Sequence, residues 1–112
     1  VAVHQFCRIG SHSFVAGGSL VRKDVPPYVK AAREPLSYVG INSVGLRRRG
    51  FDVKKVHEIQ NIYRILYQKK YNNTQAMEII QGELNATRER DEIIQFIENS
   101  QRGIMKGYFQ RN

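Results

Sequence analysis

Three consecutive arginines, Arg47, Arg48 and Arg49, stand before Gly50 and form the densest cluster of chemically capable side chains in the sequence. A guanidinium group binds phosphate oxygens through paired, charge-assisted hydrogen bonds. Three such groups beside a glycine, just ahead of a helix N-terminus, are suited to holding a diphosphate. A solvated basic surface has the same composition, so this run alone leaves both interpretations open.

The residues that usually carry catalysis are few. Three histidines, His4, His12 and His57, are scattered along the chain, and the single cysteine is Cys7. Cys7 and His12 form neither a CxxC nor an HxxxH pair, so we expect no metal site. The sequence has no P-loop and no dinucleotide-binding glycine motif, so we expect no cofactor. A lone histidine is more often structural than catalytic.

Length and charge limit the class of protein. A chain of 112 residues with 41% apolar and 25% charged residues fits one small folded domain. Its net charge of +8 is unevenly placed, because residues 1–70 hold 13 Lys and Arg against 4 Asp and Glu, whereas residues 71–112 hold 5 against 6. A basic half indicates either an anionic partner or a merely basic surface.

Composition also indicates a compartment. One cysteine cannot form an internal disulfide, which favours the reducing cytoplasm. No apolar run approaches the roughly 20 residues of a membrane-spanning helix, and no signal-peptide pattern opens the chain. We therefore expect a cytoplasmic protein with no membrane span.

The first 25 residues carry an aliphatic side chain at every sixth position. These positions are Val3, Ile9, Val15 and Val21, and four residues after each lies a small or medium side chain, at Cys7, Ser13, Ser19 and Val25. This period is typical of a parallel β-solenoid with its aliphatic residues inside, although an ordinary strand pair with chance spacing is an alternative. One coil takes three hexapeptides and cannot bury its apolar row alone. We therefore expect preceding coils or a covering chain, and a fragment that begins at Val1.

The pattern changes twice after residue 25. Pro26 and Pro27 remove backbone donors and end the solenoid, and residues 29–50 are predicted to be irregular. From Phe51 the apolar residues follow the 3.6-residue period of a helix, with Asp52 as its N-cap. The predicted buried face of this helix holds Val56, Ile59, Ile62, Tyr63 and Leu66.

Two more short helices are predicted. Lys69 and Lys70 suit the negative end of the first helix. Residues 72–74 offer a cap for the second helix, whose apolar residues are Ala76, Met77, Ile80 and Leu84. A third helix should stop near Gly103, and its apolar residues are Ile93, Ile94 and Ile97.

Four segments, in chain order, resemble one enzyme family, the UDP-N-acetylglucosamine O-acyltransferases of lipid A synthesis. Residues 3–10, VHQFCRIG, resemble the last active-site coil of that family, and residues 24–29, DVPPYV, resemble its coil-ending segment. Residues 40–51, GINSVGLRRRGF, resemble its nucleotide-binding connector, and residues 100–104, SQRGI, resemble the end of its final helix. The resemblance spans nearly the whole chain.

The resemblance implies a mixed β and α fold in three parts. Residues 1–35 would be the last coils of a left-handed parallel β-helix built from hexapeptides, 36–50 a basic nucleotide-binding connector, and 51–112 a C-terminal three-helix domain. The family is a homotrimer that transfers an R-3-hydroxyacyl group from acyl carrier protein to the 3-hydroxyl of UDP-N-acetylglucosamine, the first step of lipid A synthesis. Both of these partners are anionic, which suits the basic half, and no nucleic acid is implied.

The resemblance also assigns candidate substrate-binding residues. His4 and Gln5 match residues that line the substrate cleft at the interface between subunits. Asn42, Arg48 and Arg49 match residues that hold the nucleotide and its phosphates. These roles come from the resemblance and not from spacing or composition.

Three further points concern the acyl group and the chemistry. Gly17 matches the floor of the groove that holds the acyl chain, although a position that needs the backbone freedom of glycine is an alternative. The general base of the family is a histidine in an earlier coil, upstream of Val1. We therefore expect no catalytic residue here, and no activity from these residues alone. Val44 stands where one family member has a glutamate near the nucleotide, and residues 32–35 also differ from that member, in which a side chain there helps to bound the acyl groove.

Two alternatives remain at this point. One is another hexapeptide acyltransferase with a different acceptor. The other is a non-catalytic, basic helical module that binds an acidic protein or RNA.

Overall fold

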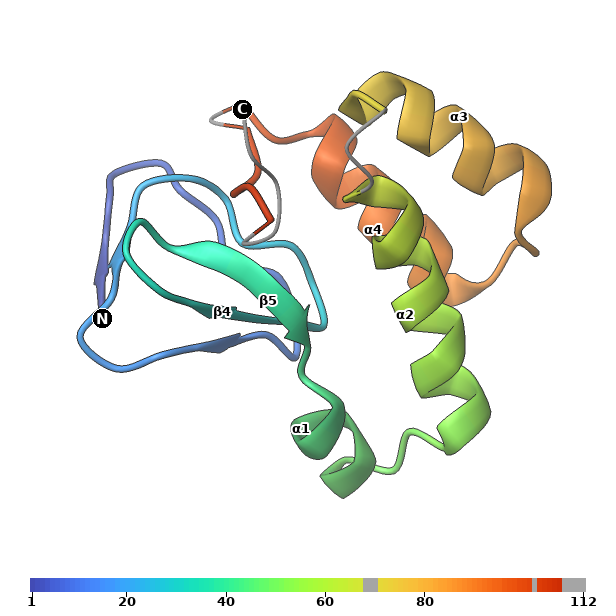
Figure 1. Ribbon diagram of the computed structural model, residues 1–112, viewed down its shortest axis with the longest axis horizontal. Coiled ribbons are helices and arrows are strands. Elements are labelled where there is room, and N and C mark those ends of the chain that lie inside the picture. The colour runs from blue at the N-terminus through green and yellow to red at the C-terminus, as the bar shows by residue number, and fades with distance from the viewer. Residues whose placement is uncertain (68–70, 102, 108–112) are drawn as a thin grey trace.

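The chain runs from a region of short strands into a region of helices (Figure 1). The computed structural model describes residues 1–67, 71–101 and 103–107, and within them there are five strands and four helices. The strands lie on one side of the molecule and α2, α3 and α4 on the other, with α1 near the end of β5. After α4 the chain returns to the strands. The predicted mixed β and α class is confirmed.

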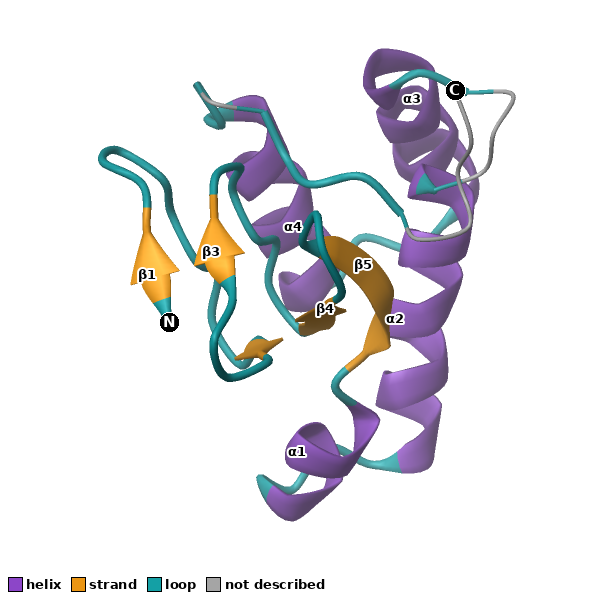
Figure 2. Ribbon diagram, turned by 60° about the vertical axis from the view of Figure 1, so that its left-hand side comes forward, coloured by secondary structure: helices purple, strands orange, loops and turns teal. Residues whose placement is uncertain are grey.

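The first strands pair in parallel at intervals close to one coil. Strand β1 (Ala2–Val3) pairs with β3 (Leu20–Val21), so that Ala2 lies opposite Leu20, eighteen residues later (Figure 2). Strand β2 (Phe14–Val15) pairs with β4 (Val29–Ala32), sixteen residues later. Parallel pairing at these intervals agrees with about three hexapeptides per coil.

The aliphatic row is buried at only one end. Val21 is fully buried and Val15 is partly buried, whereas Val3 and Ile9 are 46% and 42% exposed. The expectation that all four point into a core therefore holds for the later two within this chain. A solenoid coil buries such a row only against a neighbouring coil or another chain.

The prediction that residues 29–50 are irregular is wrong. Strand β4 forms an antiparallel pair with β5 (Ser37–Ile41), and a short helix, α1 (Ser43–Arg48), follows. The buried Val29 and Ala31 alternate with the exposed Lys30, which is the two-residue period of a strand. These elements are only four to six residues long, too short for their periods to stand out in the sequence.

The long helix α2 (Val53–Leu66) forms as predicted. The carboxylate of Asp52 accepts a hydrogen bond from the backbone N–H of Lys55 at 2.8 Å and caps the helix. Its buried face holds Val56, Ile59, Ile62, Tyr63 and Leu66. Because α2 contacts α1, α3, α4 and β5, it is the element around which the other helices are arranged.

The remaining helices begin at polar caps. Helix α3 (Asn73–Glu83) starts with a capping box between Asn72 and Gln75, and α4 (Arg88–Glu98) starts at Thr87. The end predicted near Gly103 is wrong, because α4 ends at Glu98 and the following residues turn back to the strands. The described residues of this segment, 100–101 and 103–104, therefore lie beyond the final helix, not at its end.

Some predictions lie outside the described residues, namely the helix end at Lys69 and Lys70 and the position of Arg102. None of the four described helices combines the length and the apolar composition that crossing a membrane would require.

The buried carboxylate of Asp24 joins the strands to the chain after α4. Asp24 is 1% exposed, and its two oxygens accept hydrogen bonds from the backbone N–H of Arg8 at 2.7 Å and the hydroxyl of Ser100 at 2.5 Å. Its own backbone N–H donates to the carbonyl of Gly103, and its carbonyl accepts from Met105. One residue thus fixes three segments that are far apart in sequence.

Three stacked tyrosines join β5 to α2. The rings of Tyr38 and Tyr67 stack with 4.3 Å between centroids, and Tyr63 lies beside both. The hydroxyl of Tyr63 donates to the carbonyl of Pro27 at 2.6 Å, and that of Tyr67 to the carbonyl of Met105 at 2.9 Å. Burial raises the pKa of Tyr38 to about 12, so the phenol stays neutral even in moderately alkaline solution.

We predict that Asp24→Ala lowers the free energy of unfolding by about 3 kcal/mol, because it leaves the Arg8 N–H and the Ser100 hydroxyl without their acceptor in a buried site. Urea unfolding of the chain measures the change. The control is Asp52→Ala, which removes an exposed N-cap and should cost only about 1 kcal/mol. Equal losses of unfolding free energy in the two variants would contradict the role of Asp24 in holding the strands to the segment after α4.

Candidate functional site

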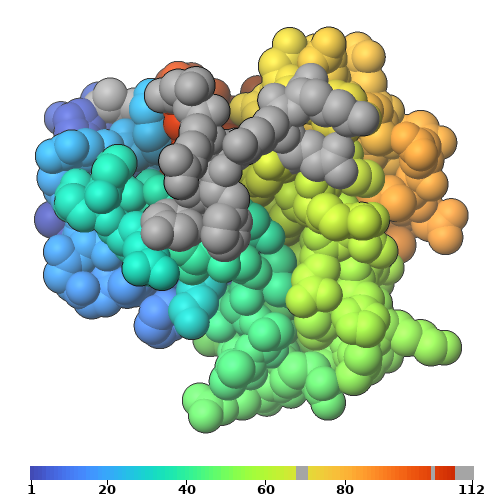
Figure 3. Space-filling view, in the orientation of Figure 1, coloured from blue at the N-terminus to red at the C-terminus, as the bar shows by residue number. Residues whose placement is uncertain are grey.

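An open pocket of about 370 Å³ lies between the strands and α1. Helix α1 forms the lower edge of the molecule in the space-filling view (Figure 3). The side chains of the pocket come from β2, β4, the end of β5, and α1 with the residues flanking it. They are Phe14, Lys30, Ile41, Asn42, Ser43, Val44, Gly45, Arg48 and Arg49. The pocket therefore gathers three of the five predicted substrate-binding residues.

The side chain of Asn42 builds one corner of this pocket. Its oxygen Oδ1 accepts a hydrogen bond from the backbone N–H of Gly45 at 3.3 Å, which caps α1, and its nitrogen Nδ2 donates to the carbonyl of His12 at 3.1 Å. Asn42 thus holds α1 to the loop at residue 12. An asparagine amide has two N–H groups and two acceptor lone pairs, so one of each remains for a ligand.

The arginine run lies at the end of α1, shortly before Asp52, the N-cap of α2. Arg47 and Arg48 occupy the last turn and Arg49 is the C-cap. Gly50, with φ +93°, and Phe51 then donate backbone hydrogen bonds back into the last turn, which is a Schellman ending. The run therefore stabilises the negative end of a helix.

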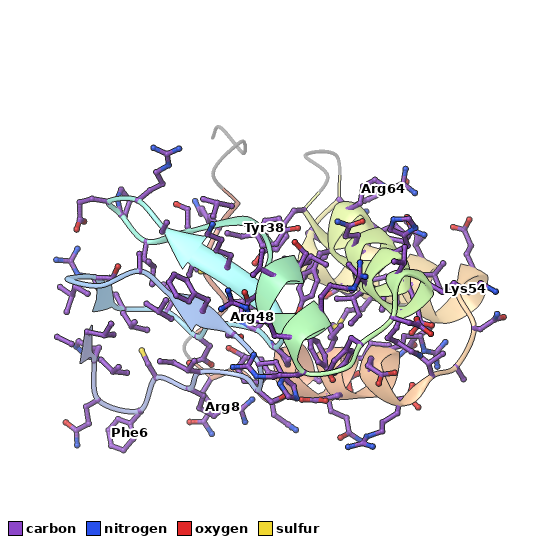
Figure 4. The ribbon with its side chains drawn as sticks, turned by 90° about the horizontal axis from the view of Figure 1, so that it is seen from below. Phe6, Arg8, Tyr38, Arg48, Lys54 and Arg64 are labelled. Atoms are coloured by element: carbon purple, nitrogen blue, oxygen red, sulfur yellow. The ribbon has the colours of Figure 1, made fainter. Side chains whose placement is uncertain are left out.

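The pocket is positively charged. Lys30, Arg48 and Arg49 line it, and no carboxylate of the described residues does. Within residues 1–67, 71–101 and 103–107 none of these three cations forms an ion pair. Arg48 projects from α1 toward the strands (Figure 4). Such a surface favours an anionic ligand.

Arg47 does not line this cationic pocket. It lines a second open pocket, of about 420 Å³, between α1 and α2, together with His57 and Gln60. Arg48 borders both pockets, and Arg49 borders only the first of the two. The three arginines are therefore not equivalent in position.

Aromatic rings support the corner that Asn42 builds. The ring of His12 stacks on Tyr28 with 5.7 Å between centroids and meets Phe51 edge-on at 5.3 Å. Tyr28 donates a hydrogen bond to Glu92 of α4 at 2.5 Å, and burial together with this bond raises the pKa of the phenol above its usual range. His12 is thus a structural residue here, and it connects the pocket to α4.

His4 and Gln5 do not line this pocket. They lie in an exposed corner turn, which the hydrogen bond from the Cys7 N–H to the His4 carbonyl closes at 3.0 Å. The next residue, Phe6, extends from the edge of the molecule, away from Arg48 (Figure 4). Within one chain, the predicted substrate residues are therefore divided between two places.

Gly17 lies in the exposed turn between β2 and β3, which the Ser19 N–H closes by donating to the Ala16 carbonyl at 3.3 Å. The positive φ of this turn, +77°, belongs to Gly18, so the backbone does not require glycine at position 17. A Cβ added to Gly17 would meet no atom within 4 Å. The groove-floor role is not tested by these observations, and Gly17 does not line the cationic pocket.

The sequence analysis missed Phe14, Lys30 and Gly45. A Cβ on Gly45 would lie 2.4 Å from Nδ2 of Asn42, so the absence of a side chain there makes room for the Asn42 amide. The spacing of Asn42 and Gly45, an N-cap residue and the N3 position whose N–H it accepts, was a usable signal. Within the described parts of the chain, no group of three or more His, Cys, Asp or Glu side chains could hold a metal ion.

Comparison with known sequences gives the class of protein. A sequence profile for UDP N-acetylglucosamine O-acyltransferase, domain 2, matches residues 24–105. An acyl-(acyl-carrier-protein)–UDP-N-acetylglucosamine O-acyltransferase of Myxococcus xanthus is 41% identical over 105 residues, and one of Halorhodospira halophila is 39% identical over 104. The chain belongs to the UDP-N-acetylglucosamine O-acyltransferase family.

Solved structures agree with this membership. A UDP-N-acetylglucosamine acyltransferase from Bacteroides fragilis superimposes with a TM-score of 0.90 at 46% identity, over 93% of this chain and 41% of that one. The Francisella novicida enzyme gives 0.87 at 38% identity, over 96% and 40%. The two curated relatives are matched over 94% and 93% of this chain but only 41% and 40% of their own length. The chain thus spans about two-fifths of the proteins it resembles.

We predict that Gly45→Ala leaves the free energy of unfolding nearly unchanged, because the new methyl group displaces the Asn42 amide from its cap at a cost of about 1 kcal/mol, which offsets the gain of about 0.5–1 kcal/mol from helix propensity. The control is Gly82→Ala in α3, where an added Cβ meets nothing within 4 Å. There, alanine should stabilise the helix by about 0.5–1 kcal/mol. Urea unfolding gives both values. Stabilisation by both variants would mean that the Asn42 amide is not held in place.

Proposed function

We propose that this chain forms the nucleotide-binding part of an enzyme that transfers an R-3-hydroxyacyl group from acyl carrier protein to the 3-hydroxyl of UDP-N-acetylglucosamine, the first step of lipid A synthesis. The main support is the cationic pocket, in which Asn42, Arg48 and Arg49 lie together in a member of this family. The names of the relatives state both the carrier protein and the nucleotide sugar.

The pocket would hold the diphosphate of the nucleotide sugar. Arg48 and Arg49 would donate charge-assisted hydrogen bonds to its oxygens, and the free N–H of Asn42 would contact the nucleotide. In the reaction, the sugar hydroxyl attacks the thioester carbonyl, an ester bond forms, the carbon–sulfur bond breaks, and the carrier thiol leaves with a proton. The residues described here bind and orient the acceptor. The general base would lie in a preceding coil.

The finer architecture is also part of the proposal. Residues 1–35 would end a left-handed β-helix of hexapeptide coils, 36–50 would be the connector, and 51–112 a three-helix domain. The interval of about one coil between paired strands and the exposed Val3 and Ile9 support stacking of further coils. In a homotrimer, the exposed corner with His4 and Gln5 would reach the cleft of a neighbouring subunit. The single free cysteine supports a cytoplasmic location.

We predict that Arg49→Ala weakens binding of UDP-N-acetylglucosamine by about tenfold or more in the intact enzyme, because one charge-assisted hydrogen bond contributes about 1.5–3 kcal/mol. Arg47→Ala is the matched control, since Arg47 borders the other pocket, and it should change binding much less. Titration calorimetry measures both affinities. Small and equal effects of the two substitutions would mean that residues 47–49 form a solvated basic surface. If the protein instead bound RNA with a steep dependence on salt concentration, the non-catalytic module would be favoured.

We also predict that the intact enzyme uses a long hydroxyacyl donor, of about fourteen carbons or more, and that Gly17→Met shifts its preference to shorter donors. Each buried CH₂ contributes about 0.8 kcal/mol, so a side chain that fills the groove removes several such contributions. Rates with a series of hydroxyacyl carrier-protein donors test this. The melting temperature should stay unchanged, because position 17 has open space. An unchanged chain-length profile would contradict the groove-floor role.

A further inference from the structure

We propose that Lys30 is a third cationic contact for the diphosphate of the nucleotide sugar, on the wall of the pocket opposite Arg48 and Arg49. This inference rests on the proposed function. It adds a strand residue to a site that the sequence assigned to residues 42–49 alone.

The position of Lys30 in the sheet explains why its side chain is available. Lys30 lies in β4 between the buried Val29 and Ala31, so it points to the opposite, exposed face. Its partner on β2 is Phe14, and its partner on β5 is Gly40. Paired residues of neighbouring strands share one face of a sheet. Because Gly40 has no side chain, no neighbouring residue on β5 covers Lys30 at that position.

The pocket then has two walls of different origin. Phe14 and Lys30 form the strand wall, and Arg48 and Arg49 form the helix wall. Phe14 is 49% exposed and supplies an apolar surface beside the cations. A diphosphate between the walls would be held from two sides, which fixes its direction better than contacts from one helix.

The charge of the pocket supports a ligand role for Lys30. Three cations without an ion pair among the described residues repel one another around one pocket, and no acidic residue lines it. Val44, which also lines the pocket, adds no negative charge either. Like charges gathered in this way oppose folding, and an anionic ligand offsets the repulsion. A lysine offers a compact charge on a flexible stem, so it can follow a phosphate oxygen.

The test is Lys30→Met in the intact enzyme, which keeps an unbranched apolar stem and removes the charge. Titration calorimetry with UDP-N-acetylglucosamine, with UDP and with uridine gives the affinities. We expect binding of the sugar nucleotide and of UDP to weaken about tenfold, and binding of uridine to stay unchanged. Lys30→Arg should restore most of the loss. Lys54→Met is the control, because Lys54 lies on α2, away from Arg48 (Figure 4), and should change nothing.

Three results would overturn the inference, and they are distinguishable. If the wild-type enzyme binds UDP and Lys30→Met binds it equally well, Lys30 does not contact the diphosphate, while the proposed function stands. If Lys30→Met raises only the KM for the carrier-protein donor, Lys30 serves the donor instead. If the wild-type enzyme binds neither UDP nor UDP-N-acetylglucosamine, the proposed function fails and the inference fails with it. Equal melting temperatures of the variants show that each one is folded.

Discussion

The hydrogen bonds to the buried carboxylate of Asp24 are the constraint on which the arrangement of the two halves depends. A buried carboxylate is costly unless its oxygens have donors, and here those donors come from Arg8 and from Ser100. The strand region and the segment after α4 are therefore brought to the same point. The tyrosine stack then fixes β5 against α2. Helix α1 lies between β5 and α2 in sequence and contacts α2. The Asp24 hydrogen bonds and the tyrosine stack therefore also restrict the position of α1.

The cationic pocket depends on this arrangement more than on any single cation. One wall belongs to strands and the other to α1, so a shift of the helix relative to the sheet would separate them. Asn42 prevents this locally, because its amide holds both the start of α1 and the carbonyl of His12. A residue that the family resemblance marks for the nucleotide thus also maintains the shape of the site. Loss of binding after a change at Asn42 would therefore have two physical causes.

Helix caps beside a clear helical period were predictable from the sequence, whereas very short elements and contacts between distant residues were not. The cap at Asp52 was identified and the cap at Asn72 was placed within residues 72–74, because each requires a particular side chain next to a helical period. Helix α1 was missed, since six residues cannot display that period. The place of Lys30 in the pocket depends on pairing with Phe14, sixteen residues earlier, which no local pattern reveals. Contacts between chains would decide whether His4 and Gln5 join the site.

The tyrosine stack gives the chain an intrinsic spectroscopic probe of its packing. The sequence contains six tyrosines and no tryptophan, and three of those tyrosines lie in the stack between β5 and α2. Stacked, hydrogen-bonded phenols in a rigid environment give near-ultraviolet circular dichroism, which is lost when packing loosens. The near-ultraviolet spectrum therefore reports on the contact between strands and helices, while the far-ultraviolet spectrum reports on the helices themselves. Loosening of the contact between strands and helices could therefore be measured by circular dichroism without attaching a label.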